Sequence, residues 1–159
     1  GVQTCALPIL DFWLGQDPKT WFGKDRDFDA VIRDRFLTTY EAVVRDGIGR
    51  WIGDARSCLP LVILLDQFPR NMFRNMARAF ESDGKARSAA RQLVAHGWDR
   101  TLAPRERMFA YLPFEHSESL ADQETCLTLM ATIAIHPDTA DMPRWARAHL
   151  DIKIGRAHV

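Results

Sequence analysis

Several features that would reveal a function directly are scarce or missing in this chain of 159 residues. No stretch of about 18 consecutive apolar residues occurs, so we expect no membrane-spanning helix and no membrane partner. Basic and acidic side chains number 21 each, and zero net charge argues against general binding to nucleic acid. Cys58 and Cys126 have no cysteine or histidine nearby at metal-ligand spacing, so we expect reduced thiols, a cytoplasmic location and no metal. No glycine-rich phosphate loop is present, and we expect no cofactor.

What the chain does contain predicts one helical domain. Apolar residues make up 47% of the sequence and charged residues 26%, as in an ordinary globular domain. Apolar positions recur at spacings of three and four, and no long segment alternates with a period of two. The expected helices cover residues 10–14, 28–46, 57–68, 83–98, 104–112, 119–134 and 143–152. Short turns join these helices, which favours an all-α fold of stacked helical hairpins.

Two prolines are expected to end helices beside the most polar segments of the chain. Residues 57–68 are almost continuously apolar, which predicts a central helix that is buried on all sides. Pro69 disfavours the helical conformation at the residue before it and should end or kink this helix. Pro113 should end the helix over residues 104–112 in the same way.

The two ends of the chain predict an origin outside the natural protein. Thr4–Ile9 can be back-translated as ACGTGTGCTCTTCCGATC, and one frame of its reverse complement encodes residues 154–158 and begins Val159. This DNA resembles a sequencing-library adapter that has been translated on opposite strands. We therefore expect a natural domain over residues 10–152, cut short at its C-terminus, with adapter-encoded residues at 1–9 and 153–159.

A first polar motif follows the central apolar helix. It contains Asp66, Gln67, Arg70 and Asn71, with Arg74 one turn further along. Asp66 and Arg70 have the spacing of an ion pair within a helix, and arginines bind carboxylates or phosphates through paired hydrogen bonds. We predict that these five residues bind a ligand. The alternative is that they only satisfy open backbone carbonyls at a buried helix end.

A second polar motif covers residues 115–118 and is followed by Asp122 and Gln123. Histidine titrates near neutral pH, so His116 is a candidate general base, with Glu118 or Asp122 as the carboxylate that orients it. We predict these three as catalytic residues and Gln123 as a ligand-binding residue. The alternative is a histidine that has only a structural role or caps a helix.

Five motifs occur in an order that resembles one bacterial family. They are Leu10–Gly15, Trp21–Phe22, Leu65–Asn71, Tyr111–Glu118 and Ala121–Gln123. Together they resemble the domain-of-unknown-function family 924 over essentially all of residues 10–152. The resemblance implies a right-handed helical array of the tetratricopeptide-like superfamily and implies no established activity. It also implies a further aromatic-Pro-His-Arg-Asn element beyond the end of this chain.

The sequence is compatible with three functions. The first is a polar cleft that binds a small anionic ligand or a peptide carboxylate, with Trp13 and Trp21 lining it. It requires Arg70 to lie within about 15 Å of His116, because direct polar contacts span only about 3 Å. The second is a hydrolase with His116 as general base, which requires this side chain to meet both solvent and a carboxylate. The third is a protein-interaction scaffold with a concave groove and no enclosed polar pocket.

Overall fold

The computed structural model describes residues 1–157, so residues 158–159 of the expected C-terminal adapter segment lie outside the described residues. The described chain is all-helical, without strands, and this confirms the predicted class. The α-helices are α1 (Val2–Leu14), α2 (Pro18–Trp21), α3 (Arg26–Asp46), α4 (Ala55–Val62), α5 (Phe68–Met72), α6 (Asp83–Ala95), α7 (Pro104–Glu115), α8 (Leu120–Ala131) and α9 (Met142–Ala157). Shorter turns are η1 (Gly49–Trp51), η2 (Ile63–Gln67), η3 (Ala77–Phe80), η4 (Trp98–Thr101) and η5 (Pro137–Thr139).

Capping residues explain where the long helices begin and end. The side chain of Asp25 accepts hydrogen bonds from the backbone N–H groups of Asp27 (2.9 Å) and Phe28 (3.2 Å), which starts α3 two residues earlier than predicted. Gly47 ends this helix with a φ of 91°, a conformation that glycine adopts without strain. The Ser119 hydroxyl accepts from the backbone N–H of Asp122 at 3.4 Å and starts α8.

The central helix does not end at its proline. α4, η2 and α5 run without a break from Ala55 to Met72, whereas the sequence predicts an end or a kink beside Pro69. Because proline has no N–H group to donate, the helix widens here into a π-helical turn, η2, which contains Asp66 and Gln67. Single π turns inside α-helices occur frequently at functional sites.

Side chains satisfy two carbonyl groups beside this proline, and that of Leu65 is the one that the missing N–H of Pro69 leaves open. The Ser82 hydroxyl donates to the carbonyl oxygen of Leu65 at 2.6 Å, and Nη1 of Arg70 donates to the carbonyl oxygen of Asp66 at 2.6 Å. The Tyr40 hydroxyl donates in turn to Ser82 at 3.2 Å. Arg70 therefore satisfies a backbone carbonyl of the buried helix, as the alternative interpretation of the first motif predicts, and also forms the ion pairs described below.

α7 also passes through a proline. It continues beyond Pro113 to Glu115, although the sequence predicts an end at Leu112. The three additional residues matter because they carry Glu115 into the molecule, where its side chain is buried. His116 follows at the C-terminal end of the same helix.

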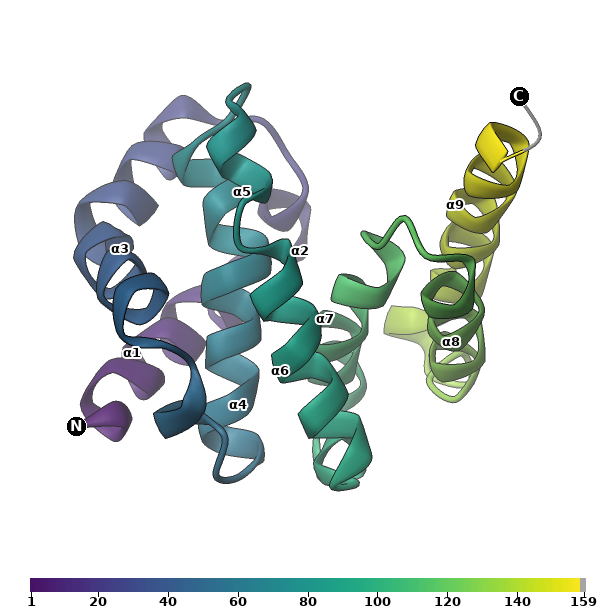
Figure 1. Cartoon of the computed structure of the whole chain (residues 1–159), viewed down its shortest axis with the longest axis horizontal. Helices are drawn as coiled ribbons and strands as arrows, with labels where there is room; N and C mark the ends of the chain where they lie inside the picture. The colour runs from purple at the N-terminus through teal and green to yellow at the C-terminus, as the bar shows by residue number, and fades with distance from the viewer. Residues whose placement is uncertain (158–159) are drawn as a thin grey trace.

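The helices follow one another in space largely in chain order (Figure 1). The rod formed by α4, η2 and α5 lies in the middle, with α1 and α3 on one side and α6 and α7 on the other. Residues 58–69 of this rod are all buried, which confirms the predicted central helix. Trp13 on α1 is fully buried against Phe68 and Phe109, with ring centroids 5.6 and 5.7 Å away.

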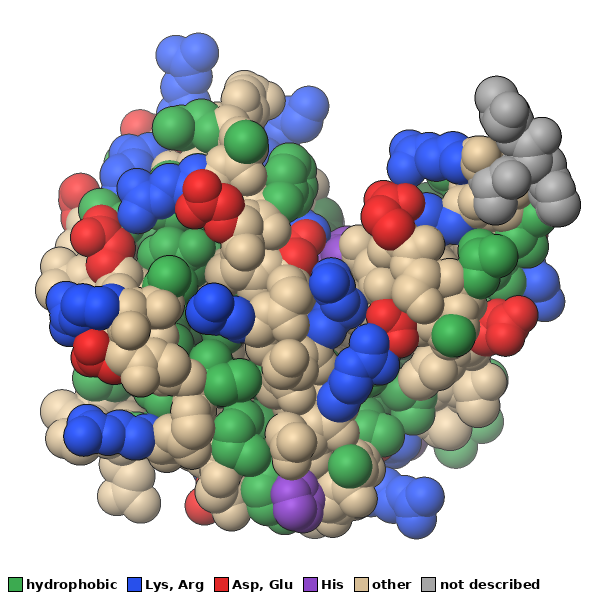
Figure 2. Space-filling view, in the orientation of Figure 1, with side chains coloured by type: hydrophobic (Ala, Val, Ile, Leu, Met, Phe, Trp, Pro, Cys, Tyr) green, Lys and Arg blue, Asp and Glu red, His purple; other side chains and the backbone are tan. Residues whose placement is uncertain are grey.

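α8 and α9 form an arm that projects from this main body (Figure 1). α8 packs on α7, and α9 packs on α8 and also reaches α7. Between the arm and the main body the surface is hollowed, and histidine atoms are visible in the hollow (Figure 2). Within residues 1–157, no helix combines the length and the apolar character needed to cross a membrane.

Candidate functional site

The two polar motifs of the sequence meet at Asp66. Its side chain is 0% exposed, and its Oδ1 atom accepts a hydrogen bond from Nδ1 of His116 at 2.8 Å. Its Oδ2 atom accepts from Nε2 of Gln67 at 2.9 Å, and Nη1 of Arg70 lies 3.5 Å from Oδ1. Arg70 and His116 thus approach the same carboxylate oxygen. They therefore lie well within the separation of about 15 Å that a shared cleft allows.

The surroundings of Asp66 keep its carboxylate ionised. Burial by itself would raise the pKa of Asp66, but His116, Arg70 and the Gln67 hydrogen bond together hold the pKa below its ordinary value. An ionised carboxylate only accepts hydrogen bonds, so Nδ1 of His116 is the protonated ring nitrogen. In the neutral form of the ring, Nε2 then carries the lone pair, and no hydrogen bond from residues 1–157 engages it.

A second carboxyl group, that of Glu115, lies beside this pair. Burial raises the pKa of Glu115, the positive fields of His149 and His116 only partly oppose the shift, and the charge of Asp66 adds to it. Among the described residues no hydrogen-bond donor engages this carboxyl group, and Nδ1 of His149 lies 3.8 Å from Oε2. Two carboxyl groups with pKa values pushed in opposite directions therefore flank His116.

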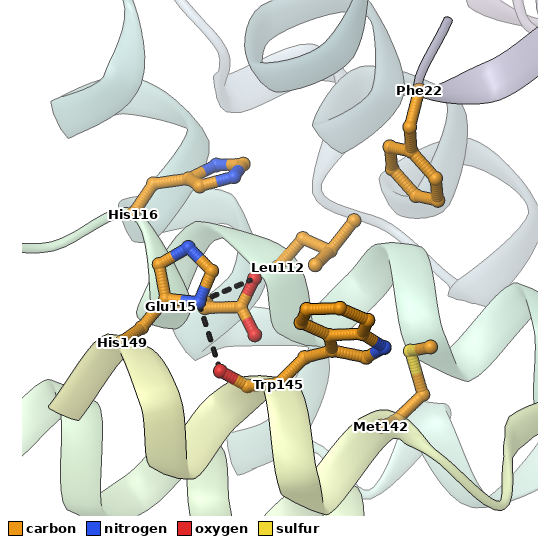
Figure 3. Close-up of a pocket in the computed structure, with 7 residues that line it drawn as sticks. All are labelled: Phe22, Leu112, Glu115, His116, Met142, Trp145 and His149. Carbon is orange, nitrogen blue, oxygen red and sulfur yellow. Dashed lines mark hydrogen bonds and ion pairs between the residues drawn. The ribbon is translucent and has the colours of Figure 1, made fainter. Parts of the chain in front are cut away.

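His149 reaches the site from α9. Its Nδ1 atom is 2.9 Å from the carbonyl oxygen of Trp145, which can only accept, so this nitrogen donates. Met142, Trp145 and His149 are spaced three and four residues apart and therefore share one face of α9. That face is turned toward Glu115 on α7 (Figure 3).

These groups line two adjoining cavities. The first has a volume of about 410 Å³ and is lined by Phe22, Leu112, Glu115, His116, Met142, Trp145 and His149 (Figure 3). The second has a volume of about 750 Å³ and shares Glu115, His116 and His149 with the first. Arg70, Asp83 and Arg87 line its other side. The acid and the histidine thus lie where two cavities meet, and both cavities have the volume of a small-molecule site.

Comparison with known proteins identifies the family. A family model described as a bacterial protein of unknown function, DUF924, matches residues 9–156. The chain belongs to this family. It is also similar to the structure of a protein of unknown function, ATU0120, from Agrobacterium tumefaciens, with 36% sequence identity and a TM-score of 0.87 over 96% of this chain and 84% of that chain. No curated protein matches the chain.

In this DUF924 protein, the arginines of the first motif are already paired. Nη1 and Nη2 of Arg70 donate to the two carboxylate oxygens of Asp83 at 2.8 and 3.0 Å. Arg74 binds Asp29 in the same bidentate manner, at 2.7 and 2.9 Å, and Asn71 donates to Asp29 at 2.9 Å. Asn71 and Arg74 therefore tie the end of the central helix to α3, and Arg70 ties it to α6.

The carboxylate that orients His116 is Asp66, which corrects the predicted roles of Glu118 and Asp122. Glu118 is 72% exposed and pairs with Lys153 and Arg156 on α9. Asp122 accepts from the Ser117 hydroxyl at 2.7 Å and from Arg91 at 2.9 Å. Sequence proximity favoured these two carboxylates, but neither of them pairs with His116, although Glu118 lines the larger cavity beside it.

The remaining predicted residues hold the site or lie near it. Nε2 of Gln123 donates to the carbonyl oxygens of Glu115 (2.5 Å) and Ser117 (2.7 Å) and so fixes the turn that carries His116. Trp13 is fully buried in the core and lines none of the cavities that contain His116, Arg70 or Trp21, which corrects its predicted place in a cleft. Trp21 donates from Nε1 to the Trp13 carbonyl oxygen at 2.8 Å. Its ring borders a small cavity of about 190 Å³, which is also lined by Gln67, Arg70, Asn71 and Arg74.

Two functional candidates, Glu115 and His149, are absent from the sequence prediction. Glu115 was obscured by Pro113, since a helix that ended there would leave Glu115 in an exposed turn. His149 carries a weak signal, the spacing of Met142, Trp145 and His149 on a helix. No group of three or more possible metal ligands occurs within the described residues of this DUF924 protein.

Proposed function

We propose that this DUF924 protein is a hydrolase in which His116 acts as general base and Glu115 acts as general acid. The observation that carries the proposal is the pairing of His116 with the fully buried Asp66 at the wall of two cavities. Asp66 fixes the ring and leaves Nε2 to accept a proton. This arrangement of a buried carboxylate and a histidine is the one that general bases of hydrolases use.

Water is the nucleophile that fits this site. The Ser117 hydroxyl donates to Asp122 at 2.7 Å, and the Cys126 thiol is fully buried, with its pKa raised by burial and by the charge of Glu115. Neither side chain therefore offers an activated nucleophile to His116. A water molecule between His116 and the substrate would supply the attacking oxygen.

The hydrolysis of an ester illustrates the proposed step. Nε2 of His116 removes a proton from water while the water oxygen bonds to the carbonyl carbon of the substrate. The bond from that carbon to the leaving oxygen then breaks, and the leaving oxygen takes the proton of Glu115. The imidazolium of His116 releases its proton to solvent and Glu115 regains one, which returns both groups to their starting state.

Binding of an anionic group, the first function considered from the sequence, fits the larger cavity as part of substrate recognition. Arg70 and Arg74 are held by Asp83 and Asp29, so an anion would have to compete with existing ion pairs. Arg87 lines the larger cavity and forms no ion pair within residues 1–157. We therefore assign recognition of an anionic group to Arg87 in place of Arg74.

We also propose a tetratricopeptide-like right-handed arrangement of the helices, a cytoplasmic location and a natural domain over residues 10–152. The third function, a protein-interaction scaffold, is favoured less because polar groups here converge on cavities of small-molecule volume. The predicted domain limits are tested by resequencing the source gene outward from primers that anneal within the codons for residues 10–152.

The experiment compares three proteins on a panel of 4-nitrophenyl and 2-naphthyl esters and phosphates. Wild type should hydrolyse at least one of these, and His116→Gln should hydrolyse it about 100-fold more slowly or worse, since general bases contribute about 10²–10⁴-fold. His136→Gln is the matched control because His136 is exposed and lines neither cavity. Equal rates for wild type and His116→Gln would refute the proposed role.

A further inference from the structure

Two aromatic rings beside the proposed acid and base stay exposed in the folded chain. Phe22 is 61% exposed and Trp145 is 51% exposed, although most large apolar side chains are buried. Both rings line the cavity of about 410 Å³ that also contains Glu115 and His116. Exposed apolar surface that faces a cavity marks a position where a ligand is bound.

The fold brings these rings to the cavity from separate segments. Phe22 directly follows the short helix α2, and the buried Trp21 next to it anchors this segment to the core. Trp145 lies on α9, on the face that also carries Met142. Phe22 lies on one side of the cavity, and Trp145 and Met142 lie on the opposite side (Figure 3).

The polar groups are confined to one end of this cavity. Glu115, His116 and His149 lie together there, whereas the apolar side chains line the remainder (Figure 3). A molecule with an apolar group at one end would therefore place its other end at the acid and the base. Aromatic walls favour a flat apolar group, because ring faces and edges gain from contact with another ring.

We infer that the substrate carries an aromatic or similarly compact apolar group that inserts between Phe22 and Trp145 and places the bond to be hydrolysed at Glu115 and His116. This inference rests on the proposed hydrolase function. It adds the chemical class of the substrate, and it assigns specificity to two side chains that take no part in the proton transfers.

The test measures binding by isothermal titration calorimetry with two carboxylates, 2-naphthoate and acetate, which share the anionic group and differ in the ring. Wild type should bind 2-naphthoate at least tenfold more tightly than acetate. Phe22→Ala and Trp145→Ala should each weaken naphthoate binding by roughly five- to tenfold, a factor typical of the loss of one aromatic contact. Ile135→Ala is the matched control, because Ile135 is 84% exposed and lines neither cavity.

A melting curve for each variant shows whether it is folded. Because Phe22 and Trp145 lie on separate segments, either variant still tests the site if the other fails to fold. If wild type does not prefer 2-naphthoate over acetate, or if neither Phe22→Ala nor Trp145→Ala weakens binding, the inference is wrong.

A separate arm of the experiment tests the proposed function. His116→Gln should lose hydrolysis of 2-naphthyl acetate. Hydrolysis by His116→Gln at the wild-type rate would refute the role of His116 as general base. Unchanged naphthoate binding by Phe22→Ala and Trp145→Ala would refute only the aromatic site.

Discussion

Replacement of Asp66 should reveal how strongly the buried carboxylate stabilises the fold. Asp66→Ala removes the acceptor for His116 and for Gln67 and one of the two carboxylates near Arg70. Loss of one partner from a buried ion pair destabilises a protein by about 3–5 kcal/mol. Arg70 keeps its bidentate bond to Asp83, so we expect the lower end of this range, about 3 kcal/mol.

Asp66→Asn separates the charge of this carboxylate from its hydrogen bonds. The amide oxygen of asparagine can still accept from His116, so most of the geometry should survive. Hydrogen bonds to charged groups contribute about 1.5–3 kcal/mol and neutral ones about 0.5–1.5 kcal/mol. The Asn variant should therefore lose about 1–2 kcal/mol, less than the Ala variant.

The assay is urea unfolding followed by circular dichroism, repeated between about pH 7 and pH 2. The pKa of Asp66 is lowered in the folded state, so its stabilisation is present above the unfolded value of about 3.9 and is lost as pH falls through the folded value. The stability of wild type should thus fall more steeply in acid than that of Asp66→Asn. Equal stability of wild type and Asp66→Ala at neutral pH, or identical acid dependence of wild type and Asp66→Asn, would refute the reasoning.

Three further predictions concern single side chains. Ser82→Ala should reduce stability in urea by about 1–3 kcal/mol because a buried carbonyl of the central helix loses its donor, whereas Ser88→Ala at an exposed site should change it by less than about 0.5 kcal/mol. Burial raises the pKa of Glu115 in the folded state, so its ionisation opposes folding above about pH 4.3; Glu115→Gln should raise the melting temperature at about pH 7 and have little effect near pH 4. Burial also raises the pKa of Cys58 to about 12, and Cys58 and Cys126 are both fully buried. A disulfide reagent should therefore modify these two thiols only after unfolding, and rapid modification of both in the native protein would contradict this.

The sequence predicts the helical class and the core of this fold well. The apolar periodicity over residues 28–46 and the continuous apolar run over residues 57–68 correspond to α3 and the central helix. The sequence fails at both prolines, because local rules place helix ends there. The surrounding structure compensates instead: a π turn and the Ser82 hydroxyl accommodate Pro69.

The sequence locates the site but misassigns part of its bonding. The two polar motifs do converge, and His116 does contact a buried carboxylate. The choice of Asp66 over Glu118 depends on how α7 crosses the central helix, and side chains adjacent in sequence carry no information on that crossing. Glu115 is hidden by the same failure at Pro113.

The central claim is that Asp66 holds His116 with Nε2 free to act as a base. Proton–nitrogen correlation NMR of the imidazole rings tests it most directly and needs no substrate, and comparison with His116→Gln assigns the signals. In its neutral form at high pH, His116 should carry its proton on Nδ1 and a lone pair on Nε2 in wild type. A neutral ring protonated on Nε2 would contradict both the hydrogen bond to Asp66 and the proposed base.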